Sequence, residues 1–216
     1  MAALFPPWAN AAARATLVAC AVVGVGVPLG LMAWVRTPNA TRQYAPVSQP
    51  VPFDHRLHVT GFGIDCRYCH SAVERSATAG IPATSMCVPC HTDSWLRSPQ
   101  LAPVRQSLAT GRPIPWNRVH ALPDFVYFDH SAHVTKGVGC ETCHGRVDQM
   151  AQVYQAAPLT MQWCVSCHRD PAPHLRPDSA ITTMGWHGGE AEPALGRRLA
   201  ATYRVRSLTN CTTCHR

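Results

Sequence analysis

Cys66-Arg67-Tyr68-Cys69-His70 is the first of five C-x-x-C-H pentapeptides in this chain of 216 residues. The other four begin at Cys87, Cys140, Cys164 and Cys211. Together the five contain ten of the eleven cysteines and five of the twelve histidines. Because every second cysteine is followed directly by a histidine, the cysteines and these histidines must be explained by one kind of site.

C-x-x-C-H is the attachment signature of c-type haem. Its two thiols, one helical turn apart, add to the vinyl groups of the porphyrin, and the histidine becomes the proximal iron ligand. A disulfide framework, a redox C-x-x-C pair or a zinc ribbon would not need that histidine. The sequence therefore predicts five covalently attached haem c groups. The predicted thioether cysteines are Cys66, Cys69, Cys87, Cys90, Cys140, Cys143, Cys164, Cys167, Cys211 and Cys214, and the predicted proximal ligands are His70, His91, His144, His168 and His215.

The composition indicates a fold with little regular structure. Nineteen prolines and fourteen glycines argue against long elements. We expect a mostly irregular chain with short α-helices, among them one from Ser98 to about Leu108 and another over 191–203, and no sheet. Haem would supply the apolar bulk that offsets the chain entropy.

The formal net charge of +7 gives little information about partners. Five haems would add about ten propionate charges and leave a slightly acidic protein. We interpret the arginines as propionate partners and solvated surface, and we expect no nucleic-acid binding.

An uncharged stretch from Ala15 to Val35, bounded by Arg14 and Arg36, predicts one membrane helix. At 1.5 Å per residue it covers about 31 Å. We expect it to be kept as an anchor rather than cleaved as a signal peptide or at Cys20 as a lipoprotein. Since haem c is attached on the outer side of the energy-transducing membrane, the haem region is expected on the periplasmic side of a bacterial inner membrane.

The region that carries the motifs is a tandem duplication followed by one extra motif. F-D-H-R-L-H-V-T-G at 53–61 matches F-D-H-S-A-H-V-T-K-G at 128–137, and two C-x-x-C-H motifs follow each copy. We therefore expect a membrane anchor over 1–36 and a proline-rich linker over 37–52. The predicted haem region comprises a first dihaem module with its connecting segment over 53–119, a second dihaem module over 120–175, and a C-terminal segment with the fifth haem over 176–216.

The repeated H-x-x-H predicts distal iron ligands. A low-spin electron-transfer haem needs a second strong axial ligand, usually His or Met. On a helix, residues i and i+3 lie on one face, so one imidazole can reach the haem of its own module and the other an adjacent haem. We predict distal ligation by His55, His58, His130 and His133.

The fifth distal ligand is predicted to be His120, in the segment between the modules. Met150 and Met161 are the main alternatives, with Met86 a weaker one, because thioether ligation is the other common choice. His174 and His187, in loops rich in proline and glycine, are expected to be surface residues.

The F-x-H-x-x-H plus C-x-x-C-H module resembles the class III cytochromes c of the c3 and c7 group. The whole pattern resembles the membrane-anchored pentahaem subunit of alternative complex III, a quinol oxidoreductase. The residues that carry this resemblance are the N-terminal helix, V-H-A-L-P-D-F-V-Y-F-D-H at 119–130, M-Q-W-C at 161–164 and the terminal motif. The quinone reductase complexes of sulfate reducers have a similar subunit.

This resemblance implies an electron wire and not an enzyme acting alone. Polytopic membrane subunits would oxidise quinol, and an iron–sulfur subunit would pass the electrons to this chain. A monohaem cytochrome c, a soluble carrier or a terminal oxidase would receive them. Two other readings are a membrane-anchored quinol dehydrogenase that feeds a periplasmic reductase and a stand-alone redox shuttle; the duplicated F-D-H-x-x-H and the fifth motif argue against the first of these.

Overall fold

The computed structural model describes residues 5–91, 97–188 and 192–215. The chain separates into two compact units, one ending at Arg42 and the other beginning at Gln43. The cut lies inside the segment predicted as a linker. Residues 45–49 form no regular element, and Tyr44 and Val47 donate backbone hydrogen bonds to Gln155 and Val153 at 3.0 and 3.2 Å. The boundaries between the modules stay a prediction.

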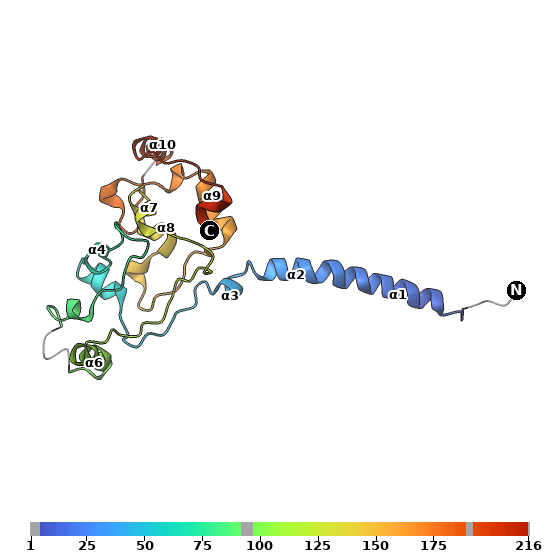
Figure 1. The fold of residues 1–216 in the computed structure, drawn as a ribbon, viewed down its shortest axis with the longest axis horizontal. Helices are drawn as coiled ribbons and strands as arrows, with labels where there is room; N and C mark the ends of the chain where they lie inside the picture. Colours follow the sequence, from blue (N-terminus) through green and yellow to red (C-terminus); the bar gives the residue numbers. More distant parts are fainter. Residues whose placement is uncertain (1–4, 92–96, 189–191, 216) are drawn as a thin grey trace. The chain divides into compact units, whose positions relative to one another are not determined.

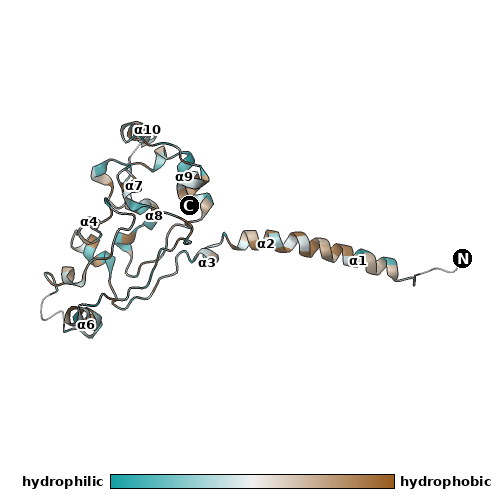
Figure 2. Cartoon of the chain, in the orientation of Figure 1, coloured by the Kyte–Doolittle hydropathy of each residue, from teal (hydrophilic) through white to brown (hydrophobic). Residues whose placement is uncertain are grey.

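The first unit is one long apolar helix and a short one. Ala9–Trp34 is continuous and consists of α1 (Ala9–Ala21), a π-helical stretch η1 (Val22–Gly26) and α2 (Val27–Trp34). Its side chains are exposed and strongly apolar (Figure 2), and its 26 residues are long enough to cross a membrane. Thr37 caps α3 (Pro38–Thr41) by accepting a hydrogen bond from the Ala40 amide.

The second unit consists of short helices joined by long loops (Figure 1). In the described residues its β-type pairings are three isolated bridges, so the expectation of a mostly irregular, short-helical fold without a sheet is confirmed. The elements are η2 (Arg56–Gly61, π), α4 (Cys66–Cys69), η3 (Thr84–Cys87), η4 (Pro99–Leu101), α6 (Ala102–Thr110), α7 (His130–Val134), α8 (Cys140–His144), η5 (Val147–Gln149), α9 (Met161–Arg169), η6 (Ala172–His174), η7 (Asp178–Ala180), α10 (Glu192–Thr202) and α11 (Cys211–Cys214).

The apolar core of this unit is divided into two small clusters. One contains Val51, Val104 and Ile114, and the other contains Val73, Val134 and Ile181. Each is smaller than the core of an ordinary domain of this length, because such a core needs many large buried side chains. The side chains alone therefore supply only part of the apolar contact that a stable fold requires.

Candidate haem-binding site

The five C-x-x-C-H motifs lie on or beside short helices, and polar side chains cap the starts of two of these helices. Asp65 accepts a hydrogen bond from the Arg67 amide at the start of α4, and Thr160 accepts one from the Trp163 amide at the start of α9. These caps begin a helical turn where the two thiols must share one face. All eleven cysteines lie in the described part of the chain, and none of them forms a disulfide.

Three of the five motif histidine rings are oriented by backbone carbonyls. Nδ1 of His70 lies 2.7 Å from the Gly80 oxygen, Nδ1 of His168 lies 3.0 Å from that of Leu208, and Nδ1 of His215 lies 3.1 Å from that of Phe125. A carbonyl only accepts, so Nδ1 donates and the lone pair of Nε2 stays available for a metal. This hydrogen bond is the one that fixes the tautomer of metal-bound histidines.

Three of the predicted distal histidines have the same arrangement. Nδ1 of His58 and of His133 bonds the main-chain oxygen of the aspartate four residues earlier, at 2.8 and 2.7 Å, and Nδ1 of His130 bonds the Ala77 oxygen at 2.8 Å. Each of these three rings therefore also presents Nε2.

Three of these rings face a motif histidine at the spacing that an iron ion requires. Two imidazoles bound on opposite sides of one metal, each through nitrogen at about 2 Å, have ring centroids roughly 6 Å apart. The centroid separations are 6.1 Å for His58 and His91, 6.3 Å for His130 and His144, and 5.9 Å for His133 and His168. The residues present thus fit axial ligation in these three pairs.

His55 is oriented toward the remaining motif of the first module. Its buried Nδ1 has no hydrogen-bond partner. Burial, followed by the neighbouring His70 and His58, lowers its pKa to about 4. Such a ring stays neutral near pH 7, which is the form that binds a metal. His70 is thus a neighbour of His55, in line with the expectation that one imidazole of each H-x-x-H reaches the haem of its own module; the sequence did not say which histidine serves which haem.

His120 lies against His144. The two ring centroids are 4.3 Å apart in an edge-to-face contact, which is too close for an iron ion between them. Nε2 of His120 is buried without a hydrogen-bond partner, and burial, followed by His130, lowers the pKa of this ring to about 4. The ring is chemically suited to ligation, and its assignment as the fifth distal ligand stays a prediction.

The alternative methionines differ in exposure. Met150 is buried beside Gly145, directly after the third motif, whereas Met161 is 68% exposed at the start of α9. Of the two loop histidines, both His174 and His187 are exposed, as expected.

The surroundings of the motifs fit a large flat apolar group better than a bare metal ion. Tyr68 and Val88 lie inside the motifs, Met86 lies directly before the second one, and all three are exposed. Over the described residues, no three His, Cys, Asp or Glu side chains are grouped to hold an ion. A porphyrin would cover such apolar side chains and supply the other four iron ligands itself.

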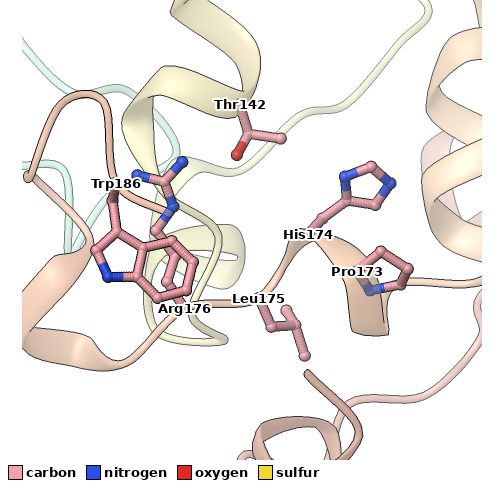
Figure 3. Close-up of a pocket in the computed structure, with 6 residues that line it drawn as sticks. All are labelled: Thr142, Pro173, His174, Leu175, Arg176 and Trp186. Atoms are coloured by element: carbon pink, nitrogen blue, oxygen red, sulfur yellow. The ribbon is translucent and has the colours of Figure 1, made fainter. Parts of the chain in front are cut away.

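A cavity of about 250 Å³ lies beside the third motif (Figure 3). It is lined by Thr142, Pro173, His174, Leu175, Arg176 and Trp186. Arg176 is buried, donates to the Thr183 oxygen at 3.0 Å and lies 3.6 Å from Glu141 and over the Trp186 ring. Since its guanidinium is paired and the cavity is smaller than the roughly 300 Å³ at the low end for ligand pockets, we interpret this cluster as structural support for α8.

Two phenylalanines have a role that the sequence interpretation did not assign. Phe53 packs on both His55 and His58, with centroids 4.8 and 4.2 Å apart, and Phe128 packs in the same way on His130 and His133 at 4.8 and 4.5 Å. The signal was present, because phenylalanine begins both copies of the F-D-H-x-x-H repeat.

Comparisons with known proteins agree with this site. Residues 126–216 match the family described as cytochrome c7 and related cytochrome c. The multiheme cytochrome c subunit of menaquinone reductase from Nitratidesulfovibrio vulgaris is 36% identical over 102 residues, which are 47% of this chain and 48% of that protein. The chain thus spans about half the length of the curated relative it matches. Residues 126–216, which hold the last three motifs, are therefore similar to cytochrome c7, a family whose cofactor is covalently bound haem c.

Proposed function

We propose that this chain is a membrane-anchored pentahaem cytochrome c that acts as an electron wire in a quinol-linked complex. Haem c would be attached at all five motifs, with the five motif histidines as proximal ligands. His55, His58, His130 and His133 would be the distal ligands of four irons, and His120 that of the fifth. Haem iron supplies reversible one-electron chemistry.

The observation that carries this proposal is a set of three histidine pairs whose ring centroids lie about 6 Å apart. Within these pairs, Nδ1 of His58, His130, His133 and His168 bonds a backbone oxygen. When protein ligands hold both axial positions, neither is open to a substrate. This arrangement supports electron transfer and argues against substrate reduction at these irons.

The apolar helix Ala9–Trp34 supports a single-pass anchor in a bacterial inner membrane, with the haem unit on the periplasmic side. We propose that the partners are those of alternative complex III: polytopic quinol-binding subunits, an iron–sulfur subunit and a monohaem cytochrome c. Electrons would enter from the iron–sulfur subunit and leave to the monohaem cytochrome, a soluble carrier or a terminal oxidase.

The direction of electron flow is a separate part of the proposal. The relative from Nitratidesulfovibrio vulgaris is named for quinone reduction, the reverse of quinol oxidation. Haems whose axial positions are both filled can pass electrons in either direction. The partner proteins and the reduction potentials therefore decide the direction of electron flow. Two rates measured on the purified complex distinguish quinol oxidation from quinone reduction. One is the rate of haem reduction by quinol, and the other is the rate of quinone reduction in the presence of an electron donor.

The haem count tests the proposal directly. Since ten cysteines pair into five motifs, mass spectrometry of denatured protein and a pyridine haemochrome assay should both give five covalent haems per chain. Cys20 lies outside the motifs, so Cys20→Ser is the matched control and should leave the count unchanged. Four or fewer haems in fully matured protein would contradict the proposal.

A further inference from the structure

The first motif of each module lies at the junction between the two modules. One turn holds both motifs: the Cys140 amide donates to the Ile181 oxygen at 3.1 Å, and the Thr182 hydroxyl donates to the carboxylate of Asp65, directly before Cys66, at 2.7 Å. The Ala77 oxygen accepts hydrogen bonds from both the backbone amide and Nδ1 of His130, at 3.2 and 2.8 Å. Cys140 also packs on the apolar cluster that joins Val73 of the first module to Val134 of the second.

The second motif of the first module lies away from this junction. Cys87 packs on the other apolar cluster, formed by Val51, Val104 and Ile114, which shares no member with the junction cluster. Its link is to the first motif, because Phe53 packs on both His55 and His58 and the ring of His58 lies 6.1 Å from that of His91. The electrostatic interactions of Cys69 with Cys87 and Cys90 agree with this link.

The second motif of the second module connects the junction to the last motif. The ring of Phe128 packs on both His130 and His133, which face His144 of the third motif and His168 of the fourth. The ring of His168 bonds the oxygen of Leu208, shortly before the fifth motif. These contacts extend the series from the third motif to the fourth and then to the fifth.

We infer that the five attachment sites form a single file in the order of the motifs at Cys87, Cys66, Cys140, Cys164 and Cys211. The first module is thus reversed relative to the sequence. In Figure 1, α4, α8 and α9 lie in this order from left to right. The terminal sites are those of His91 and His215, and the step from the motif at Cys66 to the motif at Cys140 is where the file passes from one module to the other.

An arrangement in sequence order would need the motif at Cys87 beside the motif at Cys140. The described contacts join the motif at Cys140 to the motif at Cys66 instead, and the two apolar clusters separate Cys87 from Cys140. This inference rests on the proposed attachment of five haems, so the count by mass is established first; an incorrect order in a five-haem chain would then leave the proposed function intact.

The test is the set of nuclear Overhauser effects between haem protons in the fully reduced, detergent-solubilised chain, where low-spin iron is diamagnetic. Each haem is assigned by a variant that lacks it, such as Cys87→Ser with Cys90→Ser. We expect the haem at Cys87 to contact the haem at Cys66 alone, and the haems at Cys66 and Cys140 to contact each other. Contact between the haems at Cys87 and Cys140, or none between those at Cys66 and Cys140, would overturn the inference.

Redox titration of two matched variants of the first module provides a second readout. Removing the terminal haem with Cys87→Ser and Cys90→Ser should shift the potential of one remaining haem. Removing the interior haem with Cys66→Ser and Cys69→Ser should shift the potentials of two remaining haems. If removal of the terminal haem shifts two or more potentials, the single file is wrong. Where a variant fails to mature, its haem is assigned in the unmodified chain from Overhauser effects to the protons of its own attachment cysteines, so the order is still decided.

Discussion

At the level of single side chains, neighbouring histidines are directed to different iron sites by different backbone oxygens. His130 and His133 share the ring of Phe128, but His130 bonds the oxygen of Ala77 and His133 bonds that of Asp129. Their rings therefore face His144 and His168 respectively. Three residues of separation along one short helix are sufficient to serve two sites.

Replacing His130 or His133 should leave one haem iron without its distal ligand. His130→Ala is expected to leave the iron at His144 five-coordinate, and His133→Ala the iron at His168, because each loses its distal ligand. Optical and electron paramagnetic resonance spectra should show one high-spin haem that binds carbon monoxide. The exposed His174 provides the control, since His174→Ala should keep the parent spectrum. Fully low-spin spectra from both test variants would disprove the pairing.

The fifth distal ligand is identified by the same spectra. We expect His120→Ala to produce one high-spin haem, whereas Met150→Leu and Met161→Leu should leave all haems low-spin, because neither methionine would be a ligand. A high-spin haem in a methionine variant, together with a low-spin His120→Ala, would transfer the assignment to that methionine. A methionine-ligated iron should also have the higher potential, since thioether ligation favours the reduced state.

Asp65 should contribute to stability in a pH-dependent manner. Burial raises its pKa, but hydrogen bonds from Arg67 and Thr182 outweigh that effect and lower the pKa from 3.8 to about 2. Unfolded Asp65 thus takes up a proton first, so its contribution is complete above about pH 4 and is lost as the pH falls toward 2. Denaturant unfolding should show Asp65→Asn to be less stable than the parent at neutral pH, with the difference shrinking near pH 2. The exposed Asp124→Asn should show little change, and a difference for Asp65→Asn that is independent of pH would contradict this.

At the level of elements, local chemistry sets the helix ends and tertiary contacts set the details. The prediction of a helix from Ser98 to about Leu108 is met by η4 and α6, which ends at Thr110 because Gly111 adopts a left-handed conformation. The N-terminal helix begins at Ala9, before the apolar stretch, since its alanine-rich start favours helix even where it is polar. Its π-helical stretch precedes Pro28, which has no N–H to continue the regular ladder.

The contact between α10 and η6 depends on Gly196. A β-carbon at this position would overlap the Ala172 carbonyl. Gly196→Ala should therefore destabilise the unit by about 1–3 kcal/mol through overpacking, although alanine alone favours a helix by about 1 kcal/mol. Thermal unfolding measures the loss. At the exposed Ala194 of the same helix, Ala194→Gly should cost about 1 kcal/mol from propensity alone. A Gly196→Ala chain as stable as the parent would show that α10 is not packed on η6.

At the level of the whole molecule, the membrane helix has no chemistry of its own for quinol. Over residues 15–35 it carries no ionisable group, apart from the thiol of Cys20, to accept a quinol proton, and a single span forms no cleft. The chain alone should therefore be reduced by dithionite but not at a useful rate by a quinol analogue. Adding the partner membrane subunits should restore quinol-dependent reduction.

Deleting residues 1–36 is the matched control for this prediction. It should weaken assembly with the partners while leaving the haem spectrum unchanged, since the motifs and all predicted ligands lie beyond that point. Rapid reduction of the isolated full chain by quinol, blocked by a quinone-site inhibitor, would instead favour a quinol dehydrogenase.

The sequence was sufficient for the motifs, the histidine repeat and the short-helical class, because these follow from residues close together in the chain. It could not pair distal with proximal rings, since His130 depends on Ala77 and His168 depends on Leu208. Likewise, the proximity of the motifs at Cys66 and Cys140 follows from the way the two modules pack. The first H-x-x-H also lies on a π-helix, not the expected α-helix, although its sequence nearly repeats the second.

The hydrogen bond from His130 to Ala77 also has a consequence for biogenesis. A chain that emerges and receives its haems from the N-terminus completes the loop around Ala77 before the second histidine pair has been translocated. The second F-D-H-x-x-H copy can then fold against the loop around Ala77, which is already formed, whereas no such loop precedes the first copy. Disruption of the loop at residues 76–80 should therefore impair haem attachment at Cys140 more than at Cys164. A change in the first module would then appear as a maturation defect in the second module.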